Sequence, residues 1–326
     1  MRHPAVRPLV LSALLLVPVP ALAAKVYVTN EKGNSVTVLD ATTLEVVGTH
    51  PVGARPRGIT IAPDGSELYV CVSDEDTVKV YDPKTMAELH RLPSGPDPEL
   101  FVLHPSGNPL YIANEDDNLV TVVDTKTHQV LAEIPVGVEP EGMGISPDGK
   151  VVVNTSETTN MAHFIDTTTH EITANVLVDQ RPRFAQFSDD GSRLYVSSEI
   201  GGTVSVIDPA TQTVTGTIKF EIQGVLPEAI QPVGVKVTHD GKTIFVALGP
   251  ANRVAVVNAD TLEVEDYLLT GQRVWQLAFN ADQSRLFTTN GNSNDVSIID
   301  VPARKVIQSV QVGQQPWGVV VGPDKP

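Results

Sequence analysis

Cysteine and basic residues are scarce in this chain of 326 residues. Cys71 is the only cysteine, which excludes an intrachain disulfide, and its apolar surroundings predict a buried, unreactive thiol. Lysine and arginine together number 23 against 39 acidic residues, giving a net charge of −16. Because such a surface repels nucleic acid and anionic lipid headgroups, we expect no nucleic-acid partner. A basic protein or a cation is the more natural ligand.

Several sequence motifs that mark known chemistry are also missing. The chain has no nucleophile elbow, no Cys-x-x-Cys-His haem attachment motif and no phosphate-binding loop. Its histidines are scattered, without the i, i+4 pairing that is typical of a zinc site on a helix. No long segment has the 3.6-residue period of an amphipathic helix. These absences argue against the enzyme classes that such motifs identify, and against a helical fold.

The N-terminal segment has the pattern of a secretory leader. Arg2 and Arg7 precede an apolar run over residues 9–19, and Ala21-Leu22-Ala23 resembles a cleavage site. The apolar run is shorter than the roughly 20 residues of a membrane-spanning helix. We therefore predict a signal peptide over residues 1–23, a periplasmic location, no membrane span after cleavage, and a single domain over residues 24–326.

A tight-turn position recurs at a fixed interval along the chain. The equivalent residues are Asp64, Ser106, Asp148, Asp190, Asp240, Asp282 and Asp324, with intervals of 42 residues and one of 50. Self-similarity at this period predicts a propeller or a solenoid. The Asp-Gly sequences at this position suit tight hairpins that require positive φ. A second recurring acid ends a strand in each repeat, at Asp40, Asp82, Asp124, Asp166, Asp208 and Asp300, with Asn258 in its place once. These strand-ending aspartates are expected to bind local backbone amides, because equivalent residues in every repeat cannot all be catalytic.

Each repeat contains several short runs of β-branched and aromatic residues separated by turns. Examples are residues 25–30, 35–40 and 129–134. Four strands per repeat predict an all-β fold, a seven-bladed β-propeller of four-stranded antiparallel blades. The first repeat lacks its inner strand and the last has an extra one, over residues 317–321. We expect this C-terminal strand to complete the N-terminal blade and close the ring.

The repeat resembles a known family. Tyr27-Val28-Thr29-Asn30, Tyr111-Ile112-Ala113-Asn114 and the turn Ser146-Pro147-Asp148-Gly149 are similar to the YVTN-type β-propeller repeat. Seven such repeats behind a leader also resemble the periplasmic propellers associated with PQQ-dependent alcohol catabolism. That resemblance implies a non-enzymatic protein that binds a small ligand or docks a partner. The implied partners are a periplasmic dehydrogenase, a cytochrome or a transport component.

At two positions of the repeat the residue type differs from one blade to the next, although a position with a purely structural role should keep its residue type. Both positions are expected at one mouth of the central channel. The residue after the proline that begins each inner strand, a position held by Val274 in one repeat, is Arg57, Glu99, Glu141, Arg183, Val233, Trp275 or Trp317. The residue after the second strand is Glu31, Ser73, Glu115, Glu157, Glu199, Gly249 or Gly291. The predicted ligand-binding residues are Arg57, Glu99, Glu141, Arg183, Trp275 and Trp317. The predicted metal-binding residues are Glu99, Glu115, Glu141, Glu157 and Glu199.

Two kinds of ligand fit this ring. Converging carboxylates suit a hard cation such as calcium or a lanthanide. Arginine beside an indole suits a planar polycarboxylate such as PQQ. The plain structural alternative is that the glutamates are solvated or make ordinary ion pairs and that the tryptophans plug the channel. An eight-residue insertion within residues 219–230 is expected over the same face, as an apolar lid, a docking knob or a self-packed loop.

Two alternative functions remain open at this point. Seven-bladed propellers also host lactonases, so a metal-dependent lactonase-like hydrolase is the first alternative. A cell-surface interaction module, implied by the YVTN-type resemblance, is the second. Fold alone cannot decide among them.

Overall fold

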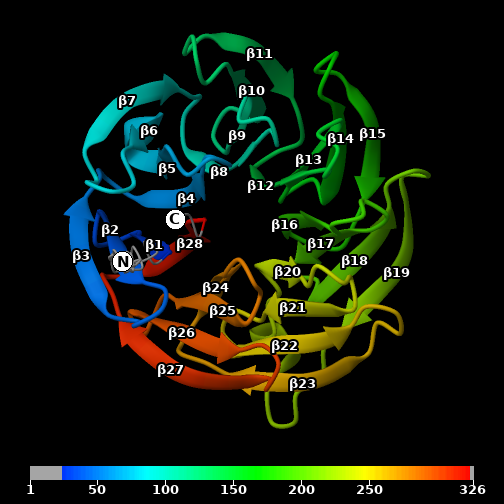
Figure 1. Cartoon of the computed structure of the whole chain (residues 1–326). Helices are drawn as coiled ribbons and strands as arrows, with labels where there is room; N and C mark the ends of the chain where they lie inside the picture. The colour runs from blue at the N-terminus through cyan, green and yellow to red at the C-terminus, as the bar shows by residue number, and fades with distance from the viewer. Residues whose placement is uncertain (1–23, 324–326) are drawn as a thin grey trace, which may run out of the picture.

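Residues 24–323, which a computed structural model describes, form seven four-stranded antiparallel sheets around a common axis (Figure 1). This confirms the predicted seven-bladed β-propeller. The predicted signal peptide and the last turn aspartate, Asp324, lie outside the described residues. No helical segment within residues 24–323 has the length and hydrophobicity needed to cross a membrane.

The strands occupy four equivalent positions in blades 1 to 7. The innermost strands are β28 (Pro316–Val321), β4 (Pro56–Ile61), β8 (Pro98–Leu103), β12 (Pro140–Ile145), β16 (Pro182–Phe187), β20 (Val235–Val237) and β24 (Val274–Phe279). The second strands are β1 (Lys25–Asn30), β5 (Leu68–Val72), β9 (Leu110–Asn114), β13 (Val151–Ser156), β17 (Leu194–Ser198), β21 (Thr243–Ala247) and β25 (Arg285–Asn290).

The outer half of each blade follows the same order. The third strands are β2 (Ser35–Asp40), β6 (Thr77–Tyr81), β10 (Leu119–Val123), β14 (Met161–Asp166), β18 (Thr203–Asp208), β22 (Arg253–Asn258) and β26 (Asp295–Asp300). The outermost strands are β3 (Val46–Pro51), β7 (Glu88–Pro93), β11 (Val130–Pro135), β15 (Ile172–Leu177), β19 (Thr213–Lys219), β23 (Val264–Leu269) and β27 (Lys305–Gln311). The described chain also contains two short 3₁₀ helices, η1 (Ser73–Glu75) and η2 (Pro227–Ala229).

The two ends of the chain share blade 1. Strand β28 pairs antiparallel with β1, bringing Val321 opposite Val26 and Val319 opposite Val28. It also contacts the inner strands of both neighbouring blades, β24 and β4. The predicted closure is therefore confirmed, and β1 has an inner strand partner like the second strand of each other blade.

The hydrophobic core lies between the faces of adjacent blades. Strand residues alternate between the two faces of each sheet, so each face contributes to a different inter-blade cluster. Between blades 1 and 2, for example, Tyr27, Val36 and Val38 pack with Val70 and Val72. Cys71 is fully buried, as predicted, and burial raises the pKa of its thiol well above the usual value.

The recurring aspartates at the ends of the third strands act locally, as predicted. Asp82 Oδ1 accepts hydrogen bonds from the backbone N–H groups of Lys84 and Thr85, at 2.7 and 3.0 Å. Equivalent contacts form at Asp40, Asp124, Asp166 and Asp208, and at Asn258. These residues complete turns and are not reaction groups.

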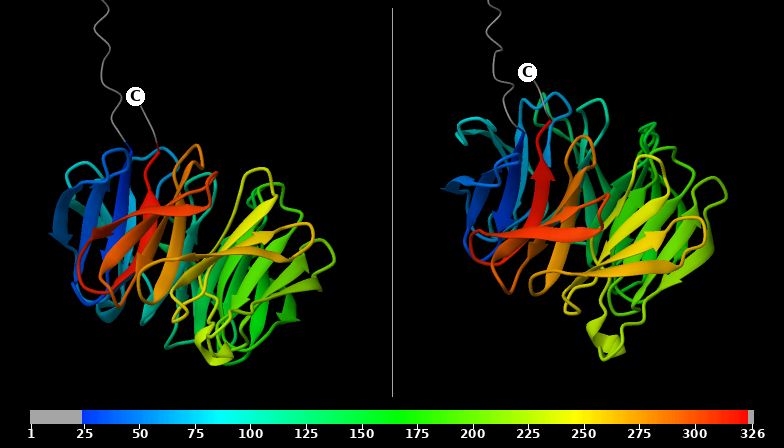
Figure 2. Two further views of the ribbon diagram at one scale, coloured as in Figure 1. Left: turned by 90° about the horizontal axis from the view of Figure 1, so that it is seen from below. Right: turned by 60° about the horizontal axis from the view of Figure 1, so that its bottom comes forward.

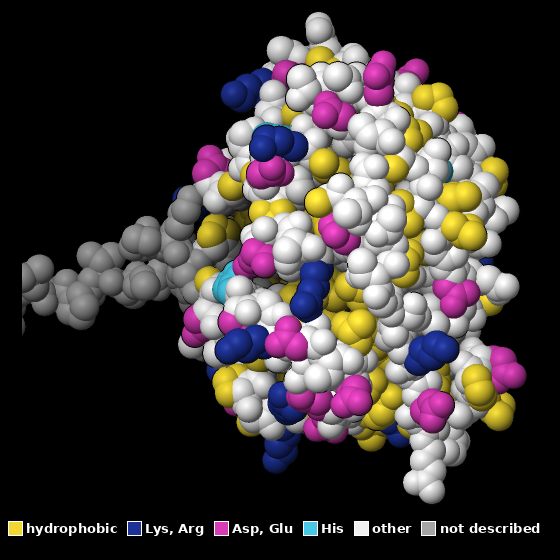
Figure 3. Space-filling model, turned by 90° about the vertical axis from the view of Figure 1, so that its right-hand side faces the viewer, with side chains coloured by type: hydrophobic (Ala, Val, Ile, Leu, Met, Phe, Trp, Pro, Cys, Tyr) yellow, Lys and Arg dark blue, Asp and Glu magenta, His cyan; other side chains and the backbone are white. Residues whose placement is uncertain are grey.

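The disc has two distinct faces. The long connection that contains η2 projects from one face, while the chain leaves β28 at the other (Figure 2). Each inner strand therefore begins at the η2 face, which we call the mouth face. On the outer side shown in Figure 3, acidic, basic and apolar side chains are interspersed, without a broad patch of one charge.

Candidate functional site

A β-bulge directs the ring residues of the mouth face into the channel. In blade 4 the pairing between β12 and β13 shifts register between Pro140 and Met143. The same irregularity occurs where the inner strands of blades 1, 2, 3, 5 and 7 begin. Because a bulge bends its strand and redirects the local side chains, the residue after the proline turns away from the normal alternation.

Threonine hydroxyls hold these bulges against the neighbouring blade. Thr289 Oγ1 accepts a hydrogen bond from the N–H of Gln276 at 3.0 Å and donates one to the carbonyl of Trp317 at 2.7 Å. Thr29 and Thr155 make the same paired contacts in blades 1 and 4. The backbone approaches so closely here that a Cβ on Gly318 would lie 2.5 Å from the carbonyl oxygen of Arg57. The ring is thereby attached to rigid strands.

A further charged column, which the sequence analysis missed, lies two residues before the ring column. Its members Arg55, Asp97, Glu139, Arg181 and Arg273 all have positive φ, between 50° and 58°. In each case a side-chain oxygen 21 residues earlier accepts the backbone N–H: the contacts are Asn34–Arg55, Asp76–Asp97, Asn118–Glu139, Asn160–Arg181 and Asn252–Arg273. The 42-residue spacing of this column was visible in the sequence, but its left-handed backbone, which projects these side chains over the channel, was not.

Arginines of blade 2 and acids of blade 3 form one group of ion pairs. Arg57 pairs with Glu99, which has no exposed side-chain surface, and with Glu31 at 3.2 Å. Arg55 pairs with Asp97 and reaches Glu99 at 3.3 Å. Two guanidinium groups therefore compensate the buried charge of Glu99.

A second group spans blades 4, 5 and 7. Arg183 Nη1 lies 2.8 Å from Glu141 and also pairs with Glu157. Arg181 bridges Glu157 and Glu199, at 2.9 and 3.1 Å. Arg273 Nη2 lies 2.6 Å from Glu199. Consequently Glu199 contacts arginines from two different blades.

The two tryptophans pack under these arginines. Their rings lie 6.3 Å apart, with Trp317 fully buried. The guanidinium of Arg57 lies 5.4 Å from the Trp317 ring, and that of Arg273 lies 4.1 Å from the Trp275 ring. Both distances are in the range of cation–π contacts. The indole N–H of Trp317 has no hydrogen-bond partner in the described chain.

These residues surround a polar pocket of about 430 Å³. Its charged lining consists of Arg55, Arg57, Asp97, Glu115, Arg181, Arg183, Glu199 and Arg273. Trp275, Gln231 and Ile200 complete the wall. Five arginines against three carboxylates give this lining an excess of positive charge, within a protein that is strongly acidic overall.

The pKa values of the carboxyl groups in the site are shifted in different directions. Burial, reinforced by Glu99, raises the pKa of Glu115 to about 7. Burial also raises the pKa of Glu141 well above its ordinary value, although Arg183 acts against this. At Glu199 burial alone would raise the pKa, but Arg183, Arg273 and Arg181 outweigh it and lower the pKa.

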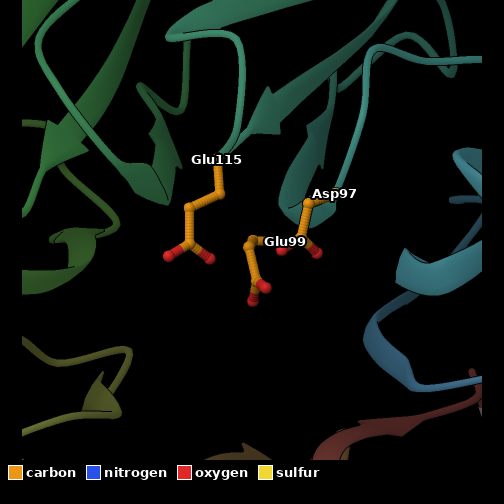
Figure 4. Close-up of side chains that lie close together, drawn as sticks. All are labelled: Asp97, Glu99 and Glu115. Atoms are coloured by element: carbon orange, nitrogen blue, oxygen red, sulfur yellow. The ribbon is translucent and has the colours of Figure 1, made fainter.

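Three acids have the spacing of a cation site. Ligand atoms of Asp97, Glu99 and Glu115 all lie within 4.8 Å of one another, and their carboxylates converge in Figure 4. Oxygen donors of this kind suit a hard cation. However, Asp97 and Glu99 already face Arg55, which would repel a cation. This set therefore fits a metal ion only if Arg55 moves away.

The six residues predicted to bind a ligand lie together at the mouth face. Arg57 contacts Glu99 and Trp317, while Arg183 contacts Glu141 and lies 5.7 Å from the Trp275 ring. The predicted metal-binding glutamates form two separate groups. Glu99 and Glu115 lie close to each other, while Glu141, Glu157 and Glu199 surround Arg183. The alternative of solvated glutamates is wrong for Glu157 and Glu199, which are buried. Their roles toward a ligand stay predictions.

The insertion before blade 6 does not form the apolar lid that was one expectation. Phe220 and Ile230 are buried, and Ile222 and Val225 pack partly against the same core cluster. Leu226, 72% exposed, is the one large apolar side chain of residues 219–230 that faces solvent. The self-packed loop is therefore the correct alternative. At the end of this loop, the polar side chain of Gln231 forms part of the pocket wall.

Comparison with known proteins supports the fold. Among solved structures, hydrazine synthase from Kuenenia stuttgartiensis is similar with a TM-score of 0.78 and 21% identity, covering 90% of this chain and 99% of that one. A functionally unknown protein from Desulfotomaculum acetoxidans has a TM-score of 0.80 and 16% identity, and the match covers 93% of this chain and 100% of that one. The dihydro-heme d1 dehydrogenase NirN in complex with DHE has a TM-score of 0.68 and 14% identity, and the match covers 95% of this chain and 77% of that one. At these identities the likeness concerns the fold alone.

Two sequence families match as well, whereas no curated protein matches the chain. The YNCE-like β-propeller family matches residues 65–177. The lactonase seven-bladed β-propeller family matches residues 143–315, just over half of the chain. These matches confirm the predicted resemblance to seven-bladed propeller families, while the link to PQQ remains a prediction. The chain belongs to the lactonase family of seven-bladed β-propellers.

Proposed function

We propose that this propeller is a non-enzymatic protein that binds a small polycarboxylate in the mouth-face pocket. The observation that carries the proposal is the convergence of Arg55, Arg181 and Arg273 on that pocket from blades 2, 5 and 7. Their side chains retain 23%, 41% and 18% exposure, so their guanidinium groups are accessible. Each guanidinium has five N–H donors, more than its protein partners use.

The chemistry of the wall favours a flat ligand. Carboxylates accept paired hydrogen bonds from arginine, and Trp275 offers an aromatic face beside Arg273. A pocket of about 430 Å³ lies in the range that holds small organic ligands. A planar aromatic polycarboxylate of the PQQ type meets these requirements. A role in periplasmic PQQ-dependent alcohol oxidation, with a dehydrogenase, cytochrome or transport component as partner, would follow from such binding.

The buried charges support a binding role over a purely structural one. Apolar side chains of similar size are often as stabilising as a buried ion network, so Arg183 and its glutamates are weak contributors to stability. Held on rigid strands, they fix the positions of the more exposed arginines. A preorganised site loses less entropy when its ligand binds.

The test is the melting temperature with PQQ, citrate or Ca²⁺ added in turn. A ligand selective for the folded state raises the melting temperature by mass action. We expect PQQ to raise it by several degrees and Arg273→Met to remove that rise. Arg304→Met is the matched control, because Arg304 makes a similar ion pair with Glu265 at 2.7 Å on the outer strands. No rise with either anion, or an equal rise in the Arg273 variant, would overturn the proposal.

A lactonase-like hydrolase is the second candidate, favoured by Glu115 and by the family. Glu115 lines the pocket without an ion-pair partner in the described chain, and its pKa of about 7 suits a general base at neutral pH. In this role it would take a proton from water attacking the lactone carbonyl, while a nearby guanidinium would stabilise the developing oxyanion.

Hydrolysis of simple lactones measures this second candidate directly. We expect any activity to fall at least a hundredfold in Glu115→Gln, the range seen when a general base is lost. Activity that disappears with EDTA and returns with Ca²⁺ would assign a metal-dependent form to Asp97, Glu99 and Glu115. Absence of lactone hydrolysis under both conditions would leave the binding protein as the function.

A further inference from the structure

The channel widens into a second cavity at the end opposite the mouth-face pocket. This chamber has a volume of about 560 Å³ and is lined by the later residues of the inner strands. Its wall has polar and apolar parts of similar extent, and the apolar part, which we call the apolar wall, includes Leu100, Val102, Ile145, Phe184 and Val320. None of the pocket arginines is part of this lining. The chamber is therefore a separate site.

One cationic side chain lies beside this apolar wall. Among the described lining residues Lys236, on β20, is the sole lysine or arginine. Its ammonium donates a hydrogen bond to Gln186 Oε1 at 3.0 Å and lies 5.6 Å from the Phe184 ring. Both partners belong to β16 of the adjacent blade (Figure 1).

No carboxylate of the described chain forms an ion pair with Lys236. Asp189, at the rim of the chamber, is hydrogen-bonded to His239 and half exposed, and it acts on Lys236 only from a distance. Burial lowers the pKa of the Lys236 ammonium to about 8, in keeping with the lack of a close carboxylate. A cation removed from water without a counter-ion gains stability from an anion that binds beside it.

We propose that the chamber binds an amphiphilic monocarboxylate, such as a medium-chain fatty acid, with its carboxylate on Lys236 and its chain along the apolar wall. The equivalent positions in the other blades are Thr60, Val102, Gly144, Gln186, Ala278 and Val320, all uncharged. A single cation beside a set of apolar side chains selects one negative charge on a ligand with an apolar chain. The mouth-face pocket selects several negative charges, so the two sites differ in ligand class.

The test is calorimetric titration of the full chain with decanoate below its micelle concentration, and with decanol as the uncharged analogue. We expect one decanoate to bind per chain, at least tenfold more tightly than decanol. Shortening the chain to octanoate and hexanoate should weaken binding about threefold to fourfold per methylene. A weak dependence on chain length would place the ligand outside the apolar wall and overturn the proposal.

Two variants locate the binding. Lys236→Met should weaken decanoate binding at least tenfold while leaving decanol binding unchanged. It should also melt at or above the wild-type temperature, because it removes a poorly compensated charge. Lys242→Met is the matched control, an exposed lysine at the turn after β20 in the same blade. Undiminished decanoate binding in the Lys236 variant, or no preference for decanoate over decanol in the wild type, would contradict the proposal.

Discussion

At the scale of single residues, buried charge distinguishes the mouth face from the rest of the molecule. Glu99, Glu141 and Glu157 are each at most 2% exposed, and Arg183 is 5% exposed. Removing such ions from water costs several kcal/mol each, which only close partners offset. Their pairing is therefore a condition for folding, whereas Glu115 has no ion-pair partner among residues 24–323 and burial raises its pKa.

Glu115→Gln should make the stability of the protein less dependent on pH. The pKa of Glu115 rises from 4.5 in the unfolded chain to about 7 in the folded one. The folded state therefore holds this proton more tightly, and its stability falls as the pH rises from 4.5 to 7. A full effect corresponds to roughly 3 kcal/mol, which partial exposure reduces to about 1–2 kcal/mol.

Urea unfolding at pH 4.5 and pH 8 measures this difference. The advantage of the glutamine variant over the wild type should grow by about 1–2 kcal/mol between these two pH values. Asp116→Asn is a neighbouring control, because Asp116 is exposed. An identical pH dependence in Glu115→Gln and wild type would mean that Glu115 is solvated in the folded protein.

At the scale of elements, the bulged starts of the inner strands in blades 1 to 5 and 7 decide where their ring residues point. In blade 7 the bulge leaves a backbone N–H unpaired within its own sheet, and the hydroxyl of Thr289 on the second strand satisfies it while also binding the next blade. In blades 1, 4 and 7 the element that positions the site is thus an inner strand together with one threonine of the second strand.

Thr289→Val tests this arrangement, because valine has nearly the same shape but no hydroxyl. We expect a loss of about 2–3 kcal/mol, since the Gln276 N–H and the Trp317 carbonyl both become buried and unsatisfied. Thr288→Val is the matched control in the same strand: Thr288 is fully buried, but its hydroxyl has no hydrogen-bond partner in the described chain. Thr288→Val should be neutral or stabilising. Equal losses in the two variants, measured by chemical unfolding, would show that packing rather than hydrogen bonding matters here.

At the scale of the whole molecule, closure of the ring links stability to the site. Trp317 belongs both to β28, which completes blade 1, and to the aromatic layer under the arginines. Opening the ring would therefore expose the edges of blades 1 and 7 and would at the same time separate the residues that line the pocket.

A chain ending at Gln315 should lose its cooperative unfolding transition. Without β28, strand β1 has no inner partner, and the core cluster shared by blades 1 and 7 loses Val319. A chain ending at Pro323 retains β28 and is the control. Thermal unfolding followed by circular dichroism distinguishes the two, and a sharp transition within a few degrees of the control in the shorter chain would refute the role assigned to closure.

The fold was largely predictable from the sequence. A repeat of 42 residues with short β-branched runs determines blades, and the unmatched C-terminal strand determines closure, because both features depend on local propensity and spacing. The position of the candidate site was predictable for the same reason, since equivalent repeat positions lie on one face of a ring. Of the six residues predicted to bind a ligand, Arg57, Arg183 and Trp275 line the pocket, while Glu99, Glu141 and Trp317 lie beside them at the mouth face, and their role toward a ligand stays a prediction.

Only the tertiary structure decided which charges pair, which remain exposed and which backbone geometry presents them. Arg55, Asp97, Arg181 and Arg273 enter the site because each is a left-handed residue just before its inner strand, a conformation with no strong signal in the sequence. Likewise, Lys236 lies beside apolar side chains of other blades because seven inner strands meet at the axis. Pairing, burial and pKa depend on distances between residues of different blades, and those distances exist only once the ring has closed.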